Sequence, residues 1–143
     1  MRTILVFLAA ISLLIPISAM GQSTLALQEK CAEGAKKFFL GLVDSYGGKW
    51  GFFDSEIWGR GYNDFTSHYN KKLDKCFILI EFHSFADKNK NAINIMDLWN
   101  VFENTRIGRL STPIEIAPDC TVSDENCKSP SEFENLIRPY MEE

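Results

Sequence analysis

The stretch HYNKKLDKCFILIEF, residues 68–82, decides the fold of this chain. Its polar centre, residues 70–74, separates two runs rich in β-branched and aromatic residues, which is the pattern of two strands joined by a hairpin. We therefore predict strands at residues 62–69 and 76–84. In the second strand one face carries Cys76, Ile78, Ile80 and Phe82, and the other carries Phe77, Leu79, Glu81 and His83. Because both faces begin apolar, this strand is predicted to lie at the centre of a sheet.

The flanking segments extend this hairpin to an α+β fold. Residues 92–102 predict a third strand and residues 109–111 a short fourth one, in an antiparallel meander. Apolar residues recur every three or four positions over residues 27–46, which predicts an amphipathic N-terminal helix. Residues 129–132, with the sequence SPSE, predict the start of a short C-terminal helix. The predicted fold class is α+β, with one helix lying in a curved antiparallel sheet in a cystatin-like arrangement.

The four cysteines predict two disulfides. An even number of cysteines in an exported chain is typical of disulfide bonding. We favour Cys120 with Cys127, which are close together in an irregular loop over residues 113–128, and this leaves Cys31 with Cys76. A zinc site is the alternative, but the spacings lack the close cysteine pairs of zinc ribbons. No metal or other cofactor is predicted.

The N-terminus has the order of a secretory signal peptide. Arg2 precedes an apolar stretch over residues 4–17, and small residues surround Met20. We predict a signal peptide at residues 1–21, with cleavage after Ala19 or Ser23 as alternatives, and a single α+β domain at residues 22–143. A retained membrane anchor is the competing interpretation. The expected location is periplasmic or extracellular, with no stable membrane insertion after cleavage.

The charge argues against one class of partner. The formal net charge is −4, and loss of Arg2 with the signal peptide changes it to −5. Proteins that bind nucleic acids concentrate lysine and arginine on one face, and this sequence has no such stripe. Nucleic acid is therefore not a predicted partner.

Residues 50–62, WGFFDSEIWGRGY, form the most unusual segment. Glycines interrupt its aromatic residues, and neither helical nor strand periodicity is visible. The segment is expected to pack on the core as a lid or to lie on the surface as a binding loop, because aromatic side chains are common anchors of recognition surfaces. The candidate binding residues are Trp50, Phe52, Phe53, Trp58 and Tyr62.

The two histidines are the only candidates for catalysis. His68 and His83 have carboxylates nearby in sequence, so a small hydrolase that uses one of them is the alternative function. Metal sites normally need three or four converging ligands, and two histidines more often form structural hydrogen bonds. No residue is assigned a catalytic role, and an enzyme is the less favoured interpretation.

The segment from His68 to Phe82 resembles one found in a family of small exported bacterial proteins that are themselves uncharacterised. The C-terminal pattern is similar as well, with CKS at residues 127–129, EF at 132–133 and RPYMEE at 138–143. The resemblance implies a bacterial exported protein and carries no catalytic residue. We therefore expect a binding or inhibitory module of the cell envelope or exterior, with a protein, peptide or glycan as its partner.

Overall fold

The structure, a computed structural model, describes residues 23–45, 51–55, 59–85, 92–113 and 119–142. The elements follow in the predicted order of helix, strands, disulfide-closed segment and helix, so the α+β class is confirmed. They are α1 (Thr24–Ser45), β1 (Gly51–Ser55), β2 (Gly59–Asn70), β3 (Lys75–Ser84), β4 (Ile93–Asn100), β5 (Thr105–Pro113), β6 (Asp119–Val122), β7 (Glu125–Asn126) and α2 (Pro130–Met141).

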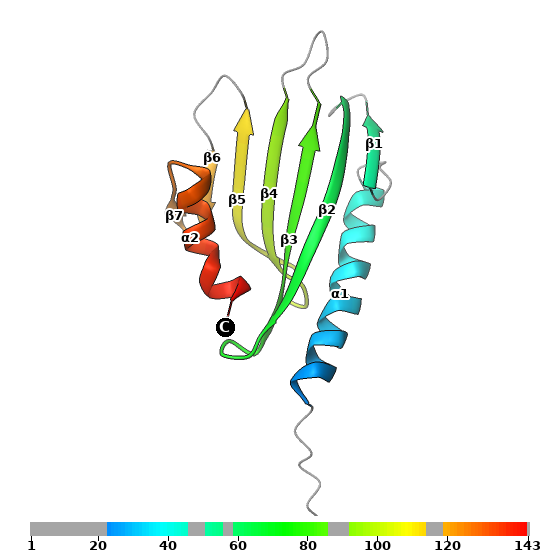
Figure 1. The fold of residues 1–143 in the computed structure, drawn as a ribbon, viewed down its shortest axis with the longest axis vertical. Helices are drawn as coiled ribbons and strands as arrows, with labels where there is room; N and C mark the ends of the chain where they lie inside the picture. The colour runs from blue at the N-terminus through cyan, green and yellow to red at the C-terminus, as the bar shows by residue number, and fades with distance from the viewer. Residues whose placement is uncertain (1–22, 46–50, 56–58, 86–91, 114–118, 143) are drawn as a thin grey trace, which may run out of the picture.

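The described strands form one seven-stranded antiparallel sheet in which sequence neighbours are also spatial neighbours (Figure 1). The predicted meander is therefore confirmed, and β3 lies inside the sheet between β2 and β4. The expectation that residues 50–62 carry no strand is wrong, because β1 pairs with the start of β2 from Gly51↔Asn63 to Ser55↔Gly59. Main-chain hydrogen bonds build this pairing, and glycines make them without contributing to a side-chain alternation.

The prediction of an irregular loop over residues 113–128 is also wrong in part. β6 pairs with β5, and β7 pairs with β6. These strands have four and two residues, which is too short for a period-two pattern to be visible in the sequence. The predicted fourth strand at residues 109–111 is the middle of the longer β5.

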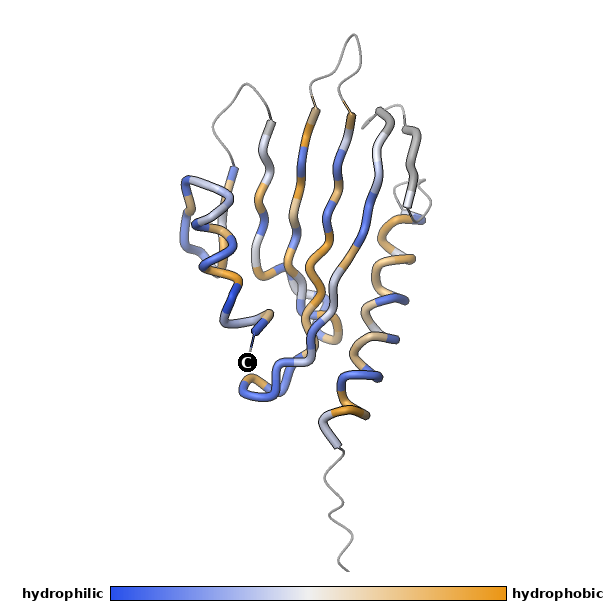
Figure 2. Tube along the Cα trace, viewed as in Figure 1, coloured by the Kyte–Doolittle hydropathy of each residue, from blue (hydrophilic) through white to orange (hydrophobic). Residues whose placement is uncertain are grey.

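Helix α1 covers one face of the sheet. Its residues Cys31, Ala35, Phe39 and Val43 are buried at three- and four-residue spacing, as the amphipathic pattern predicts. They pack on the even-numbered side chains of β3, which are Cys76, Ile78 and Ile80, and on Tyr69 of β2. Figure 2 shows the hydrophobic residues along α1 and the central strands that form this layer.

Helix α2 packs on the opposite face, which the cystatin-like arrangement of a single helix did not anticipate. Its buried residues Phe133 and Ile137 belong to one hydrophobic cluster with Phe77, Leu98 and Leu110 of the sheet. Ser129 caps the helix by accepting a hydrogen bond from the Glu132 amide at 3.2 Å. The helix continues across Pro139 to Met141. The sheet is therefore covered from both sides, with α1 beside β2 and α2 beside β5 and β6 (Figure 1).

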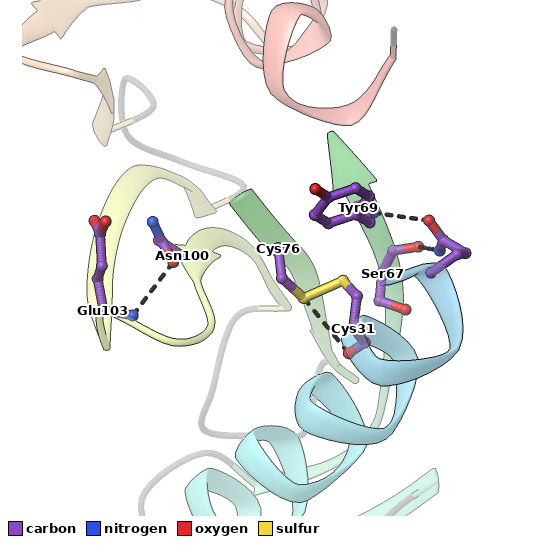
Figure 3. Close-up of a disulfide and its surroundings, with 7 residues drawn as sticks. Cys31, Ser67, Tyr69, Cys76, Asn100 and Glu103 are labelled. Atoms are coloured by element: carbon purple, nitrogen blue, oxygen red, sulfur yellow. Dashed lines mark hydrogen bonds between the residues drawn. A yellow bond between two sulfur atoms is a disulfide. The ribbon is translucent and has the colours of Figure 1, made fainter. Parts of the chain in front are cut away.

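Both disulfides have the favoured pairing. Cys31 of α1 is bonded to Cys76 of β3, with 5.4 Å between their Cα atoms, and this bond lies in the core beneath the helix (Figure 3). Cys120 is bonded to Cys127, with 5.0 Å between Cα atoms, and the Cys127 amide also donates to the Cys120 carbonyl at 3.0 Å. The first bond fixes the helix to the sheet, and the second closes the β6–β7 hairpin.

Two side chains satisfy backbone groups at the lower end of β2. Gln28 of α1 accepts a hydrogen bond from the Tyr69 amide at 2.9 Å and donates to the Ser67 carbonyl at 3.5 Å (Figure 3). β1 pairs with Gly59–Asn63, and the Gln28 amide takes the place of a neighbouring strand further along this edge, at Ser67 and Tyr69. Asn70, at the end of β2, donates to three carbonyls near the end of α2, which are those of Pro139, Tyr140 and Glu142.

Candidate functional site

On the face that carries α2, none of the described helices covers the end of β2, β3 and β4 at which Tyr62, His83 and Asn94 lie. Strand register places Tyr62 opposite His83 and His83 opposite Asn94, so these three side chains form one row across three strands. The next row contains Asp64 and Glu81. We call the residues of this region the His83 cluster; its members are Tyr62, Asp64, Glu81, His83, Phe85 and Asn94.

His83 is held from two sides by hydrogen bonds. Its Nδ1 lies 3.0 Å from Oδ1 of Asn94, and its Nε2 lies 3.3 Å from Oε2 of Glu81. When both nitrogens carry a proton, the ring donates to both oxygens at once. Each nitrogen already has a partner, so this geometry orients the ring and does not present a free base to a substrate.

Aromatic rings form the exposed part of the cluster. The ring of Tyr62 stacks on His83, with 4.5 Å between centroids and 22° between planes. Phe85 lies next to it, with its ring centroid 6.2 Å from that of Tyr62 and tilted by 44°. Tyr62 is 40% exposed and Phe85 is 47% exposed. The fixed imidazole therefore supports the solvent-facing ring of Tyr62, and Phe85 lies against Tyr62.

Two carboxylates lie in the row next to Tyr62 and His83. Asp64 and Glu81 are directly opposite each other on β2 and β3. Asp64 is exposed and accepts a hydrogen bond from the Phe65 amide at 2.8 Å, and the Glu81 side chain is 37% exposed. The cluster thus combines apolar ring surface, hydrogen-bonding groups and negative charge, which are the elements of a recognition surface.

Only one of the five predicted binding residues can be placed in this cluster. Tyr62 belongs to it, whereas Trp50 and Trp58 lie outside the described residues. Phe52 and Phe53 are in β1, opposite Tyr62 and Gly61 respectively, but their side chains are not described. The loop hypothesis for residues 50–62 therefore remains a prediction.

The two histidines do not converge. His68 and His83 lie on the same face, but the register pairs His68 with Phe77 and His83 with Tyr62. Six residues of β2 separate these positions, which corresponds to about 20 Å along a strand. The register therefore does not bring the two histidines together into one site. Within the described ranges no three potential metal ligands gather together.

The sequence does not single out Phe85 or Asn94 as candidates. Phe85 follows the predicted strand at residues 76–84, and Asn94 lies near the start of the predicted strand at residues 92–102. Nothing in either segment distinguishes these residues from solvated positions. The available signal was the parity of the middle strand, which placed Glu81 and His83 on one face. The register of β4, which brings Asn94 to His83, is a property of the tertiary structure.

A second ionisable group is buried on the α1 face. Asp97 of β4 lies with its Oδ1 3.8 Å from Nε of Arg109. Burial raises the pKa of the Asp97 carboxyl above its ordinary value, although Arg109 and Arg106 act in the opposite direction. Oδ1 of Asp97 is buried, and it has no hydrogen-bond partner among the described residues.

Comparisons with known proteins add no functional assignment. Within the described ranges, no helix has both the length and the apolar character needed to span a bilayer. No protein-family model, no curated protein and no solved structure matches this chain. The His83 cluster therefore remains the candidate site.

Proposed function

We propose that this protein is an exported, non-catalytic binding module whose recognition surface is the His83 cluster. The supporting observation is the pair of exposed rings, Tyr62 and Phe85, of which Tyr62 stacks on an imidazole that Glu81 and Asn94 hold in place. Aromatic residues on rigid strands contribute large contact area while losing little conformational entropy on binding. The partner is a protein, peptide or glycan of the bacterial cell envelope or exterior.

The export part of the proposal is supported by the two disulfides, which persist in oxidising compartments. The N-terminal pattern over residues 1–21 supports it independently. Intact-mass measurement of the protein from its native host should show loss of these residues and a deficit of four hydrogens. Full-length protein with free thiols would contradict this part.

The binding part is tested by site-specific photo-crosslinking in the native host. A benzoylphenylalanine is introduced at Phe85, and separately at Phe102, which is 60% exposed in the turn between β4 and β5. Phe102 is the matched control because it is also an exposed phenylalanine but lies at the other end of β4 from Asn94. We expect a discrete crosslinked product from position 85 only. No product at 85, or identical products at both positions, would refute the proposal.

The hydrolase alternative receives less support. It depends on His68 or His83, and both ring nitrogens of His83 already have hydrogen-bond partners. Replacement of both histidines by alanine discriminates between the functions, because a binding module would retain its fold and part of its crosslinking, whereas an enzyme would lose all turnover.

A further inference from the structure

The hydrogen bonds of His83 indicate how the recognition surface is regulated, an inference that rests on the proposed binding function. Nε2 of the ring lies 3.3 Å from Oε2 of Glu81, and Nδ1 lies 3.0 Å from Oδ1 of Asn94. An ionised carboxylate only accepts hydrogen bonds, so Nε2 keeps its proton for Glu81 in both charge states of the ring. The proton that a histidine gains and loses between about pH 5 and 8 is therefore, in this ring, the one on Nδ1, beside Asn94.

The side-chain amide of Asn94 is able to follow this change of charge. It has an oxygen that accepts and a nitrogen that donates, and the two exchange places when the group rotates by half a turn. Charged His83 donates from Nδ1 to Oδ1, which is the observed arrangement. Neutral His83 has a lone pair at Nδ1 that would face the lone pairs of Oδ1, whereas a reversed amide donates to it from Nδ2. Loss of the proton therefore favours reversal of the Asn94 amide.

Reversal of this amide changes what the His83 cluster presents to solvent. Asn94 is half-buried. While its oxygen is committed to charged His83, its N–H donors are left for a ligand, and after reversal its oxygen is left instead. The ring of Tyr62 stacks on His83 at 4.5 Å, so it lies on a cation in the first state and on a neutral ring in the second. A cation against an aromatic face stabilises the stack.

The groups that face the imidazole come from three strands. They are Glu81 of β3, Tyr62 and Asp64 of β2, and Asn94 of β4. The side chain of Arg60, which shares this face by strand parity, and residues 86–91 lie outside the described part of the chain. Of the two described hydrogen-bond partners of the ring, Asn94 is the one that can both accept and donate, so it responds to the charge of the ring.

We propose that protonation of His83 switches the recognition surface between two states. In the charged state the ring donates to Glu81 and Asn94, the Asn94 amide presents its donors outward, and Tyr62 lies on a cation. In the neutral state the amide is reversed, its oxygen faces outward, and the stack with Tyr62 is weaker. An aromatic ring that is already held in place loses less conformational entropy on binding, so the partner binds more tightly at acidic pH.

Nitrogen-15 NMR of the mature protein at about pH 5.5 and about pH 8 tests the switch itself, because histidine changes its charge across this range. We expect Nε2 of His83 to carry a proton at both pH values and Nδ1 to carry one only at the acidic value. The side-chain amide signals of Asn94 should move between the two, while those of the exposed Asn126 stay in place. A neutral ring with its proton on Nδ1, or Asn94 signals that do not move, would contradict the switch.

Crosslinking from position 85 in cell-envelope extract at the same two pH values tests the effect on binding. We expect about threefold more product at the acidic value, which is the size of an exposed cation–π contact. Asn94→Asp places a carboxylate at Nδ1, which cannot donate to a neutral ring, so His83 stays charged and the pH dependence should disappear. Asn126→Asp makes the same change at an exposed position of β7 and should keep the dependence. Thermal melting checks that both variants are folded.

The outcomes separate this inference from the proposed function. Equal product at both pH values, or a pH dependence that is unchanged in Asn94→Asp, would overturn the inference and leave the binding function in place. Absence of product at both pH values refutes the binding function, and the inference with it.

Discussion

At the scale of single residues, the buried polar side chains of Asn70 and Asp97 differ in their hydrogen-bond partners. Asn70 is fully buried at the end of β2, where its amide nitrogen faces carbonyls of α2 and its oxygen accepts from the Leu73 amide at 2.9 Å. Asp97 is buried within β4 on the other face. Both residues are polar inside a largely apolar layer, so their partners determine whether they stabilise the fold.

Replacement of Asn70 by aspartate should be strongly destabilising. The variant keeps the oxygen that caps the β2–β3 turn but directs a carboxylate oxygen at the carbonyls of Pro139, Tyr140 and Glu142. A buried charge without a donor costs several kcal/mol, so we expect a loss of about 3 kcal/mol in the free energy of unfolding. Urea unfolding measures it, with the exposed Asn126→Asp as control. A change below about 0.5 kcal/mol would show that this contact does not hold α2.

Replacement of Asp97 by asparagine should have a pH-dependent effect of defined sign. Because burial raises the pKa of this carboxyl, the folded state binds its proton more tightly than the unfolded chain does. Ionised Asp97 therefore lowers stability at neutral pH, and this cost disappears as the pH falls below the ordinary carboxyl pKa. We expect Asp97→Asn to be more stable than the wild type at pH 7.5, with the difference shrinking at acidic pH.

Chemical denaturation across the pH range measures this difference, and the exposed Asp119→Asn is the control. A variant whose stability relative to the wild type falls as the pH rises would mean that the Arg109 ion pair outweighs burial.

At the scale of elements, two glycines differ in the space that surrounds them. Gly108 of β5 lies under α2, where an added Cβ would be 3.0 Å from Cγ2 of Val122 and 3.1 Å from the Thr121 carbonyl oxygen. Gly41 of α1 is exposed, and an added Cβ there would meet no atom within 4 Å. One glycine is thus required by close packing and the other only weakens its helix.

Alanine at these two glycines should change stability in opposite directions. Gly41→Ala should raise the free energy of unfolding by about 0.8 kcal/mol, because alanine loses less backbone entropy in a helix. Gly108→Ala should lower it by about 2 kcal/mol through overpacking against β6 and Phe133. Parallel thermal and urea unfolding measure both changes. If the two variants shifted stability in the same direction, the close packing of α2 on β5 and β6 would be refuted.

Replacement of Gln28 by alanine should expose the lower edge of β2. The variant loses both hydrogen bonds to the strand, at Ser67 and Tyr69, and we expect it to be about 1.5 kcal/mol less stable. Hydrogen exchange of the Tyr69 amide should become at least about tenfold faster, because no strand or side chain then protects it. The neighbouring exposed Glu29→Ala serves as control. Unchanged exchange at Tyr69 would show that Gln28 is not the strand substitute inferred from the geometry.

At the scale of the whole molecule, the two disulfides contribute unequally. The Cys31–Cys76 bond spans 45 residues and joins a helix to the centre of the sheet, whereas Cys120–Cys127 spans seven residues within one hairpin. Longer closed loops restrain the unfolded chain more. The Cys31–Cys76 bond therefore stabilises the packing of the helix on the sheet, and the Cys120–Cys127 bond stabilises a local hairpin.

Serine pairs in place of each disulfide test this difference. We expect a loss of about 4 kcal/mol for Cys31→Ser with Cys76→Ser, and of about 2.5 kcal/mol for Cys120→Ser with Cys127→Ser. Urea unfolding of the two variants, each with the other disulfide intact, gives the comparison. A larger loss for the hairpin variant would contradict a core held together by the longer bridge.

The sequence by itself determined the elements whose side chains repeat with a period. The apolar spacing of residues 27–46, the alternation in residues 76–84 and the SPSE cap at residues 129–132 predicted α1, β3 and α2, and the spacing of four cysteines favoured the observed pairs. These signals are local, because burial of one face and capping of a helix end act within a few turns of the chain.

Only the tertiary structure decided β1, the β6–β7 hairpin and the His83 cluster. Strands that are short or rich in glycine are held by main-chain hydrogen bonds, which leave no periodic pattern in the side chains. The cluster depends on register across β2, β3 and β4, which brings Tyr62, His83 and Asn94 into one row while it keeps His68 about 20 Å away. A register is fixed by the packing of whole strands between two helices, and no single segment of the chain encodes it.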